Sequence, residues 1–96
     1  MAAYLVVEVN VEDKSEFENY KVMAAQAVSA YGGKYLARGG AVTVLEGDWE
    51  PERLVIVEFE SAERAMQWWD SDEYEEAKNL RQRVATTRMI LVEGLS

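Results

Sequence analysis

The 96-residue sequence contains no cysteine and no histidine. Without cysteine, the chain can form no disulfide and has no thiolate nucleophile. Without histidine, it lacks the commonest general base of enzymes, the commonest metal ligand in proteins and the usual axial ligand of haem. A catalytic proton transfer in this protein would therefore depend on a carboxylate or a tyrosine, and no cofactor is expected.

Basic residues are also scarce, since 10 lysines and arginines stand against 18 aspartates and glutamates, for a formal net charge of −8. Nucleic acid and anionic membrane surfaces attract cationic proteins, so neither is an expected partner. The first residues include no basic segment followed by an apolar run, and no apolar run approaches 18 residues. We therefore expect no signal peptide and no membrane span, and a cytoplasmic location.

What the sequence does contain is an internal repeat within a single domain covering residues 1–96. Residues 5–9 (LVVEV) resemble residues 54–58 (LVIVE), and each begins a half of the chain. Residues 42–47 (VTVLEG) resemble residues 89–94 (MILVEG), and each ends a half. Because a helical pattern lies between each beginning and each end, the chain reads as strand–helix–strand written twice.

In the first half, apolar residues alternate over residues 4–11, which predicts a strand with one apolar face. Asp13 is a suitable N-cap for a helix that ends at Gly32 and Gly33. A strand is predicted over residues 34–37, is interrupted by the glycine pair 39–40 and continues extended over residues 41–46.

In the second half, residues 47–51 form a loop that holds the only proline, and residues 53–59 form the richest β-pattern. Ser61 can cap a second helix, and residues 70–72 indicate a break with a new cap. The helical pattern then continues to Val84, and residues 88–93 form the last predicted strand.

The order β-α-β-β-α-β predicts an α+β, ferredoxin-like fold, in which two helices cover one face of a four-stranded antiparallel sheet. The opposite face has no helix to cover it, although each strand places a large aliphatic residue there. Because an exposed apolar sheet face normally marks an interface, we expect a homodimer in which two sheets pack face to face.

Several linked motifs carry a resemblance that extends over nearly the whole chain: YGGKYLARGG at 31–40, LEGDW at 45–49, Arg53 with VEF at 57–59, SDEY at 71–74, Arg81, and VEG at 92–94. Together they resemble the small bacterial family catalogued as domain of unknown function 1330, within the dimeric α/β-barrel superfamily. The resemblance implies a ferredoxin-like protomer and a barrel formed by two protomers, and it implies no particular activity.

Superfamily relatives include antibiotic-biosynthesis monooxygenases, muconolactone-isomerase-like enzymes and haem-degrading enzymes, many with a site between the sheet and the helices. The haem-degrading type requires a histidine, which this chain lacks. Cofactor-free oxidation, isomerisation and plain ligand binding stay open, because a shared fold does not determine chemistry.

Two arginines are candidate ligand-binding residues. Arg38 directly precedes Gly39 and Gly40, where a ligand could approach the backbone while the guanidinium holds a carboxylate or enolate; alternatively, Arg38 pairs with an acidic residue. Arg81 shares a helical stripe with Tyr74 and needs a partner. It is either a ligand clamp or one half of an ion pair with Glu58 or Glu8 that docks the helix on the sheet.

Glu58 is the candidate catalytic base, since a carboxylate near an apolar cleft can have a raised pKa; it could equally be a solvated strand residue. Tyr20 and Tyr74 could line a pocket or belong to the core. Trp49, in the polar loop, either covers the cleft or packs at the dimer interface. The acidic clusters match no metal-binding loop, so no metal site is expected.

The leading hypothesis is that the protein binds a small anionic or aromatic metabolite in a helix–sheet cleft. Whether it is also a cofactor-independent enzyme of the monooxygenase or isomerase type stays open. The alternative is a non-catalytic dimeric interaction or stress-associated module whose charged residues only stabilise the fold. A pocket of about 300 Å³ or more lined by both arginines favours the first hypothesis. A packed helix–sheet layer in which both arginines have partners favours the second.

Overall fold

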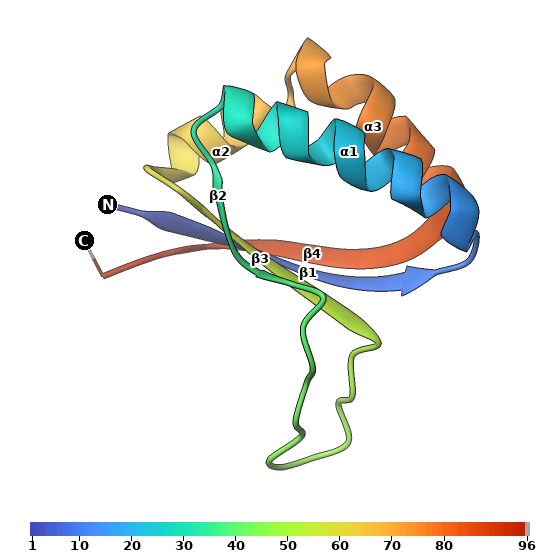
Figure 1. The fold of residues 1–96 in the computed structure, drawn as a ribbon. Coiled ribbons are helices and arrows are strands. Elements are labelled where there is room, and N and C mark those ends of the chain that lie inside the picture. Colours follow the sequence, from blue (N-terminus) through green and yellow to red (C-terminus); the bar gives the residue numbers. More distant parts are fainter. Residues whose placement is uncertain (96) are drawn as a thin grey trace.

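The computed structural model describes residues 1–95, which form a four-stranded antiparallel sheet with the strand order β2-β3-β1-β4. All the helices cover the same face of this sheet, as Figure 1 shows. The ferredoxin-like arrangement predicted from the sequence is thus confirmed. None of the described helices is both long enough and apolar enough to span a membrane. The elements are β1 (Ala3–Val11), α1 (Lys14–Ala30), β2 (Lys34–Arg38), β3 (Arg53–Phe59), α2 (Ala62–Trp69), α3 (Asp72–Val84) and β4 (Ala85–Glu93).

Side-chain caps start the helices at the positions that the sequence predicts. The Asp13 carboxylate accepts a hydrogen bond from the Glu16 amide, and the Ser61 hydroxyl accepts one from the Arg64 amide. Ser71 both caps α3 and donates to the Trp68 carbonyl at the end of α2. Because Ser71 satisfies the backbone of both helices, the predicted break at residues 70–72 divides the second helical segment into α2 and α3.

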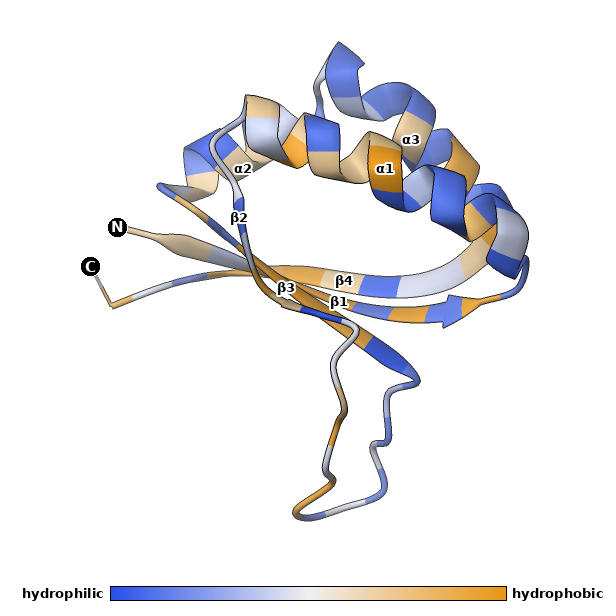
Figure 2. Cartoon of the chain, viewed as in Figure 1, coloured by the Kyte–Doolittle hydropathy of each residue, from blue (hydrophilic) through white to orange (hydrophobic). Residues whose placement is uncertain are grey.

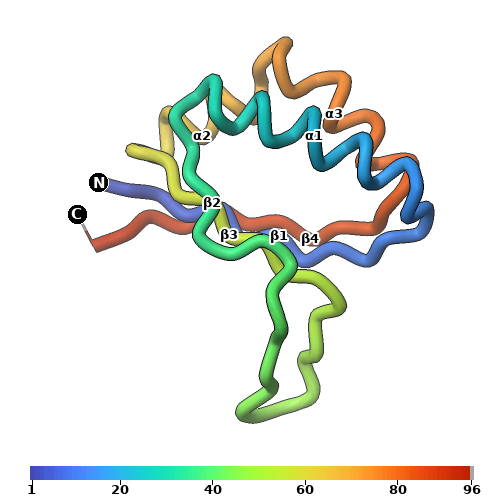
Figure 3. Tube along the Cα trace, in the orientation of Figure 1, coloured from blue at the N-terminus to red at the C-terminus, as the bar shows by residue number. Residues whose placement is uncertain are grey.

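Two predicted strand boundaries are wrong. Residues 41–46 do not form a strand, because the left-handed backbone of Gly39 (φ 75°) turns the chain away from the sheet edge. Residues 39–52 instead form an irregular arm, which extends away from the sheet on the side opposite the helices (Figures 1 and 3). The last strand begins at Ala85 rather than at residue 88, since the whole of β4 pairs with β1.

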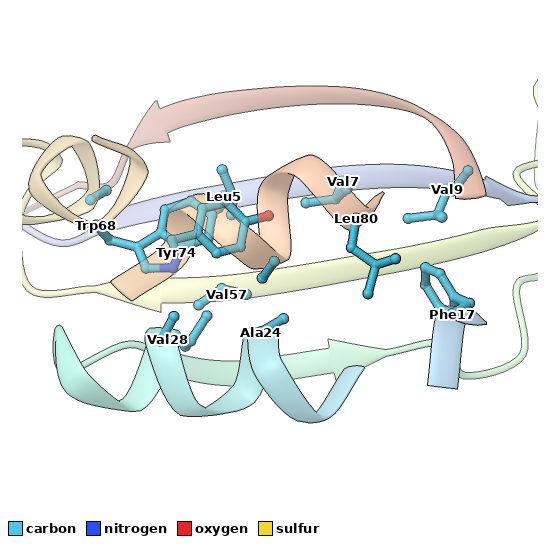
Figure 4. Packing of buried hydrophobic residues seen from close by; sticks show 14 of the residues in the cluster. Leu5, Val7, Val9, Phe17, Ala24, Val28, Val57, Trp68, Tyr74 and Leu80 are labelled. Atoms are coloured by element: carbon cyan, nitrogen blue, oxygen red, sulfur yellow. The ribbon is translucent and has the colours of Figure 1, made fainter. Parts of the chain in front are cut away.

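Strand alternation divides the sheet into a helix-covered face and a helix-free face. Leu5, Val7, Val9 and Val57 point toward the helices and are buried with Phe17, Trp68 and Tyr74 (Figure 4). Apolar residues also recur along the strands at the positions between them (Figure 2). On the helix-free face, Ile90 is 64% exposed, so this chain alone does not cover the apolar surface there.

Candidate functional site

A cavity of about 40 Å³ lies between the sheet and helices α1, α2 and α3, and we call it the helix–sheet cavity. Its volume is enough for about three water molecules and is well below that of an ordinary ligand pocket. The cavity is lined by Leu5, Val7, Val9, Phe17, Tyr20, Lys21, Ala24, Val28, Tyr35, Arg38, Arg53, Val55, Val57, Trp68, Tyr74 and Met89.

A bulge in the edge strand β2 directs two polar side chains to this cavity. Tyr35 pairs with Val57 and Arg38 pairs with Val55, although Arg38 is three positions from Tyr35 and their partners are only two positions apart. In a regular strand, residues three apart point to opposite faces. The extra residue between Tyr35 and Ala37 therefore places Arg38 on the helix-covered face, which is how β-bulges reorient side chains near sites.

Three cations form a rim around the cavity: Lys21, Arg38 and Arg53. The Arg38 guanidinium donates to the Lys21 carbonyl oxygen at 2.9 Å and lies 4.5 Å from the centre of the Tyr35 ring. Lys21 forms an ion pair with Glu18 at 2.9 Å, and its hydrogen bond to the other carboxylate oxygen at 3.3 Å lowers the pKa of the Glu18 carboxyl. Glu18 lies outside the cavity, and none of the residues within 1–95 that line it carries a carboxylate.

Gly39 makes room for the third cation. A Cβ atom at this position would collide with the Arg53 guanidinium, which also lies 5.4 Å from the centre of the Phe17 ring. The glycine therefore allows another group to approach the backbone closely, as expected from its position next to Arg38. That group is the Arg53 side chain rather than a ligand.

Two hydrogen-bond donors of the lining have no acceptor. The Nε of Arg53 and the indole Nε1 of Trp68 are both buried and unpaired among the described residues. Trp68 is only 2% exposed and packs its ring against Phe59 and Tyr74, at centroid distances of 5.5 and 4.2 Å. Since a buried donor without an acceptor costs about 1–3 kcal/mol, these two groups favour a bound acceptor in the cavity.

Three tyrosines, Tyr20, Tyr35 and Tyr74, complete the polar part of the lining. The hydroxyls of Tyr20 and Tyr74 are 3.0 Å apart, and the Arg81 Nε donates to Tyr74 Oη at 3.3 Å. Burial raises the pKa of the Tyr20 phenol well above its ordinary value of 10.0. Tyr20 is therefore protonated at neutral pH, and it can donate a hydrogen bond but is not a base.

Comparison with known proteins agrees with this architecture. The model of the family described as "Domain of unknown function (DUF1330)" matches residues 2–95. The chain belongs to the DUF1330 family. No curated protein matches it.

The solved structures that resemble this DUF1330 chain share its fold at low sequence identity. A protein of unknown function from Rhodopseudomonas palustris is 19% identical with a TM-score of 0.79, and the match covers 99% of this chain and 83% of that one. A candidate antibiotic biosynthesis monooxygenase from Caulobacter crescentus is 14% identical with a TM-score of 0.69, covering 99% and 91%. SnoaB, a cofactor-independent oxygenase from Streptomyces nogalater, is 8% identical with a TM-score of 0.64, covering 99% and 94%. At these identities the likeness shows the fold alone.

The structure of this DUF1330 chain brings some of the predicted site residues together and separates others. Arg38, Tyr20 and Tyr74 line the helix–sheet cavity. Arg81 lies behind Tyr74 and does not line it. The suggested ion pair of Arg81 with Glu58 or Glu8 is not formed, because Arg81 donates instead to Tyr74 and to the Thr87 hydroxyl.

Glu58 and Trp49 lie on the helix-free face, away from the cavity. Glu58 alternates with the buried Val57 and pairs in register with Tyr4. Trp49 donates from its indole to Glu8 at 3.0 Å, and Glu8 also accepts from Arg88 at 2.6 Å. The expected grouping of Glu58 and Trp49 with Arg38 is therefore corrected, because the sheet separates them.

The Trp49 side chain borders a second hollow of about 630 Å³ on this helix-free face, together with Glu8 and Arg88. The hydrogen bonds from Trp49 and Arg88 lower the pKa of Glu8 below its usual 4.5. Within residues 1–95, no cluster of three acidic side chains is arranged to hold a metal ion.

Sequence reasoning missed four polar lining residues: Lys21, Tyr35, Arg53 and Trp68. Arg53 was detectable, since it has the same strand parity as Val55 and Val57 and so points to the helix-covered face. Trp68 follows the buried Ala65 by three residues, which is the spacing of one helix face. The position of Lys21 carries no such signal.

Proposed function

We propose that this protein binds a small anionic metabolite, a short-chain carboxylate, in the helix–sheet cavity. The observation that supports this proposal is the one-sided chemistry of the lining. Lys21, Arg38 and Arg53 supply positive charge, Trp68 and Arg53 each have a buried donor without an acceptor, and none of the lining residues within 1–95 carries a carboxylate. Charge-assisted hydrogen bonds to such donors are what a carboxylate ligand needs.

The volume of the cavity sets the size of the ligand. About 40 Å³ does not admit an aromatic ring, so of the two ligand classes expected from the sequence we retain the anionic one. The carboxylate would lie at the cationic rim, and a body of a few heavy atoms would enter the apolar interior.

The donors of the cavity suit a reaction in which negative charge develops on a ligand oxygen, such as the formation of an enolate. A protonated Tyr20 and the cations of the rim would stabilise that charge. With Glu58 on the opposite face of the sheet, the lining residues within 1–95 provide no carboxylate base. Binding is therefore the function that the geometry supports best, and a cofactor-independent reaction would need a proton acceptor from the ligand or from water.

We also propose that two copies pack their helix-free faces together. Support comes from the exposed apolar residues of that face, including Ile90 and Val92, and from the exposed apolar residues Leu45 and Trp49 of the arm. Such a dimer would leave the cationic rim, on the opposite side of the sheet, accessible to ligand.

A second candidate function, the non-catalytic module, is favoured by a different observation. Arg38 and Arg81 both have hydrogen-bond partners within the chain, and the cavity is smaller than the 300 Å³ expected of a ligand pocket. In this case water molecules would satisfy the donors of Trp68 and Arg53.

Titration of the protein with acetate, propionate and pyruvate, followed through the indole resonances in ¹H–¹⁵N NMR spectra, separates the two functions. We expect a saturable shift of the Trp68 indole, and an affinity about tenfold lower in Arg38→Met, which corresponds to about 1.4 kcal/mol. Lys34→Met is the matched control, since Lys34 is an exposed cation of the same strand that pairs with Glu58 on the other face. Absence of a saturable shift, or an equal loss in the control, would favour the module.

A further inference from the structure

A buried arginine stands at the end of a hydrogen-bonded chain that leads to the helix–sheet cavity. Arg81 is 3% exposed, and within residues 1–95 it forms no ion pair with a carboxylate. Its Nε donates to Tyr74 Oη, and the Tyr74 and Tyr20 hydroxyls are 3.0 Å apart. Tyr74 is fully buried, whereas Tyr20 borders the cavity and is half-buried.

The chemistry of arginine fixes the direction of this chain. A guanidinium has only donors, so Tyr74 Oη must accept the hydrogen bond from Arg81. The hydroxyl proton of Tyr74 then needs an acceptor, and Tyr20 Oη is the one that the described residues offer. If Tyr20 donated to Tyr74 instead, the Tyr74 proton would be buried without a partner, at the cost of an unsatisfied donor. The satisfied arrangement runs from Arg81 to Tyr74 to Tyr20.

We propose that Arg81 is a positioning residue that makes Tyr20 a hydrogen-bond donor toward the cavity, and that the site thereby selects 2-oxo acids over the corresponding 2-hydroxy and 2-amino acids. The selection of ligands rests on the proposed function, whereas the direction of the hydrogen bonds from Arg81 to Tyr74 to Tyr20 does not. Since Tyr20 does not give its own proton to Tyr74 in this arrangement, that proton is available to a ligand oxygen.

Three polar groups of the lining would then offer donors: the Tyr20 hydroxyl, the Trp68 indole N–H and the Arg53 Nε–H. The Tyr35 hydroxyl also belongs to the lining and can either donate or accept. A ligand oxo group is an acceptor only and can accept two of these bonds. A hydroxyl or ammonium group brings a proton of its own, for which the Tyr35 hydroxyl is the one acceptor among these four groups. Because donors outnumber acceptors in this lining, an oxo group is favoured over either. With its carboxylate at the cationic rim, a 2-oxo acid of three or four carbons suits both the charge and the size of the cavity.

This role also accounts for a cation buried without a counter-ion. Burying a guanidinium that has hydroxyl partners but no carboxylate partner is unfavourable, and an apolar side chain of similar length would pack at least as well. Arg81→Met is therefore expected to leave the stability unchanged or to raise it. A role confined to holding α3 on the sheet predicts the opposite change.

The affinities for pyruvate and L-lactate test the selection. We expect the wild-type protein to bind pyruvate at least about tenfold more tightly than lactate. In Arg81→Met and in Tyr74→Phe this ratio should fall below about threefold, while the affinity for propionate stays within about twofold, because the cationic rim is intact. Tyr31→Phe is the control for the loss of a hydroxyl, since Tyr31 donates to Glu73 away from the cavity. A ratio that is equal in all four proteins would overturn the role of Arg81.

A neutron structure of the deuterated, ligand-free protein tests the direction of the chain by itself. We expect the deuterium of Tyr74 Oη on the line to Tyr20 Oη. A deuterium of Tyr20 on that line instead would overturn the inference, whatever the protein binds. If the wild-type protein binds none of the acids, the proposed function fails, and the neutron structure still decides whether Arg81 orients the two hydroxyls.

Discussion

Replacement of Gly39 by alanine perturbs the backbone and the cationic rim together. Gly39 has a φ of 75°, a conformation that costs a residue with a Cβ about 1–2 kcal/mol. The new Cβ would also collide with the Arg53 guanidinium. Because the guanidinium is the end of a flexible side chain, moving it adds little to the loss of stability. The displacement does remove one of the three cations from its place at the cavity.

We therefore expect Gly39→Ala to lose about 1–2 kcal/mol of unfolding free energy, or roughly 4–15 °C in Tm for a domain of this size. Short-chain carboxylates should bind several-fold more weakly to it. Urea denaturation followed by tryptophan fluorescence measures the first effect, and the NMR titration with propionate measures the second.

Two other glycines separate the contributions of strain and displacement. Gly32 has a φ of 74° and open space around it, so Gly32→Ala should show a similar loss of stability with unchanged binding. Gly40 has open space and no left-handed backbone, so Gly40→Ala should be close to neutral. If Gly39→Ala binds propionate as tightly as Gly32→Ala does, the placement of Arg53 has no role in binding and the reasoning is refuted.

Three more outcomes are open to measurement. Hydrogen bonds from Trp49 and Arg88 lower the pKa of Glu8, so ionised Glu8 stabilises the fold above its usual pKa of 4.5, and this contribution is lost as the pH falls through the lowered pKa. The unfolding free energies measured in urea at pH 6 and pH 3 should therefore differ less in Glu8→Gln than in wild type. Equal differences would contradict this prediction. Burial raises the pKa of Tyr20, so above pH 10 the unfolded chain loses this proton before the folded one, and stability should fall by at most about 1.4 kcal/mol per pH unit. In Tyr20→Phe the fall of stability with pH should lack this contribution. An unchanged dependence of stability on pH would count against it. Ile90→Asp should convert a dimer into a folded monomer in sedimentation velocity, and a wild-type monomer at micromolar concentration would exclude the dimer.

The sequence predicted the elements whose signals are local. Asp13, Ser61 and Ser71 cap their helices because each hydroxyl or carboxylate reaches an amide three residues ahead, a rule that needs no tertiary contact. The alternation along β1 likewise predicted which of its residues face the core. These local signals, taken with the order of the elements, were enough to predict the ferredoxin-like sheet.

The site was less predictable, because it depends on features that are not local. Arg38 points to the cavity because of the bulge in β2, and no residue in the segment 34–38 is typical of a bulge. The exposed arm has the apolar composition of a strand, so composition alone predicts an extended strand over residues 41–46, where the structure has none. Glu58, by contrast, alternates with the buried Val57, so strand parity alone places it on the face opposite Arg38.

The same alternation allows binding and assembly to be separated by mutation. Along β3, Arg53, Val55 and Val57 face the cavity, whereas Leu54, Ile56 and Glu58 face the surface proposed for the second copy. A change at Val55 should therefore alter ligand affinity without altering the oligomeric state, and a charge at Ile56 should do the reverse. One strand carries both surfaces. If a change at either position altered both ligand affinity and oligomeric state, the sheet would transmit dimerisation to the cavity. If each change altered only one of them, each protomer would bind its ligand independently.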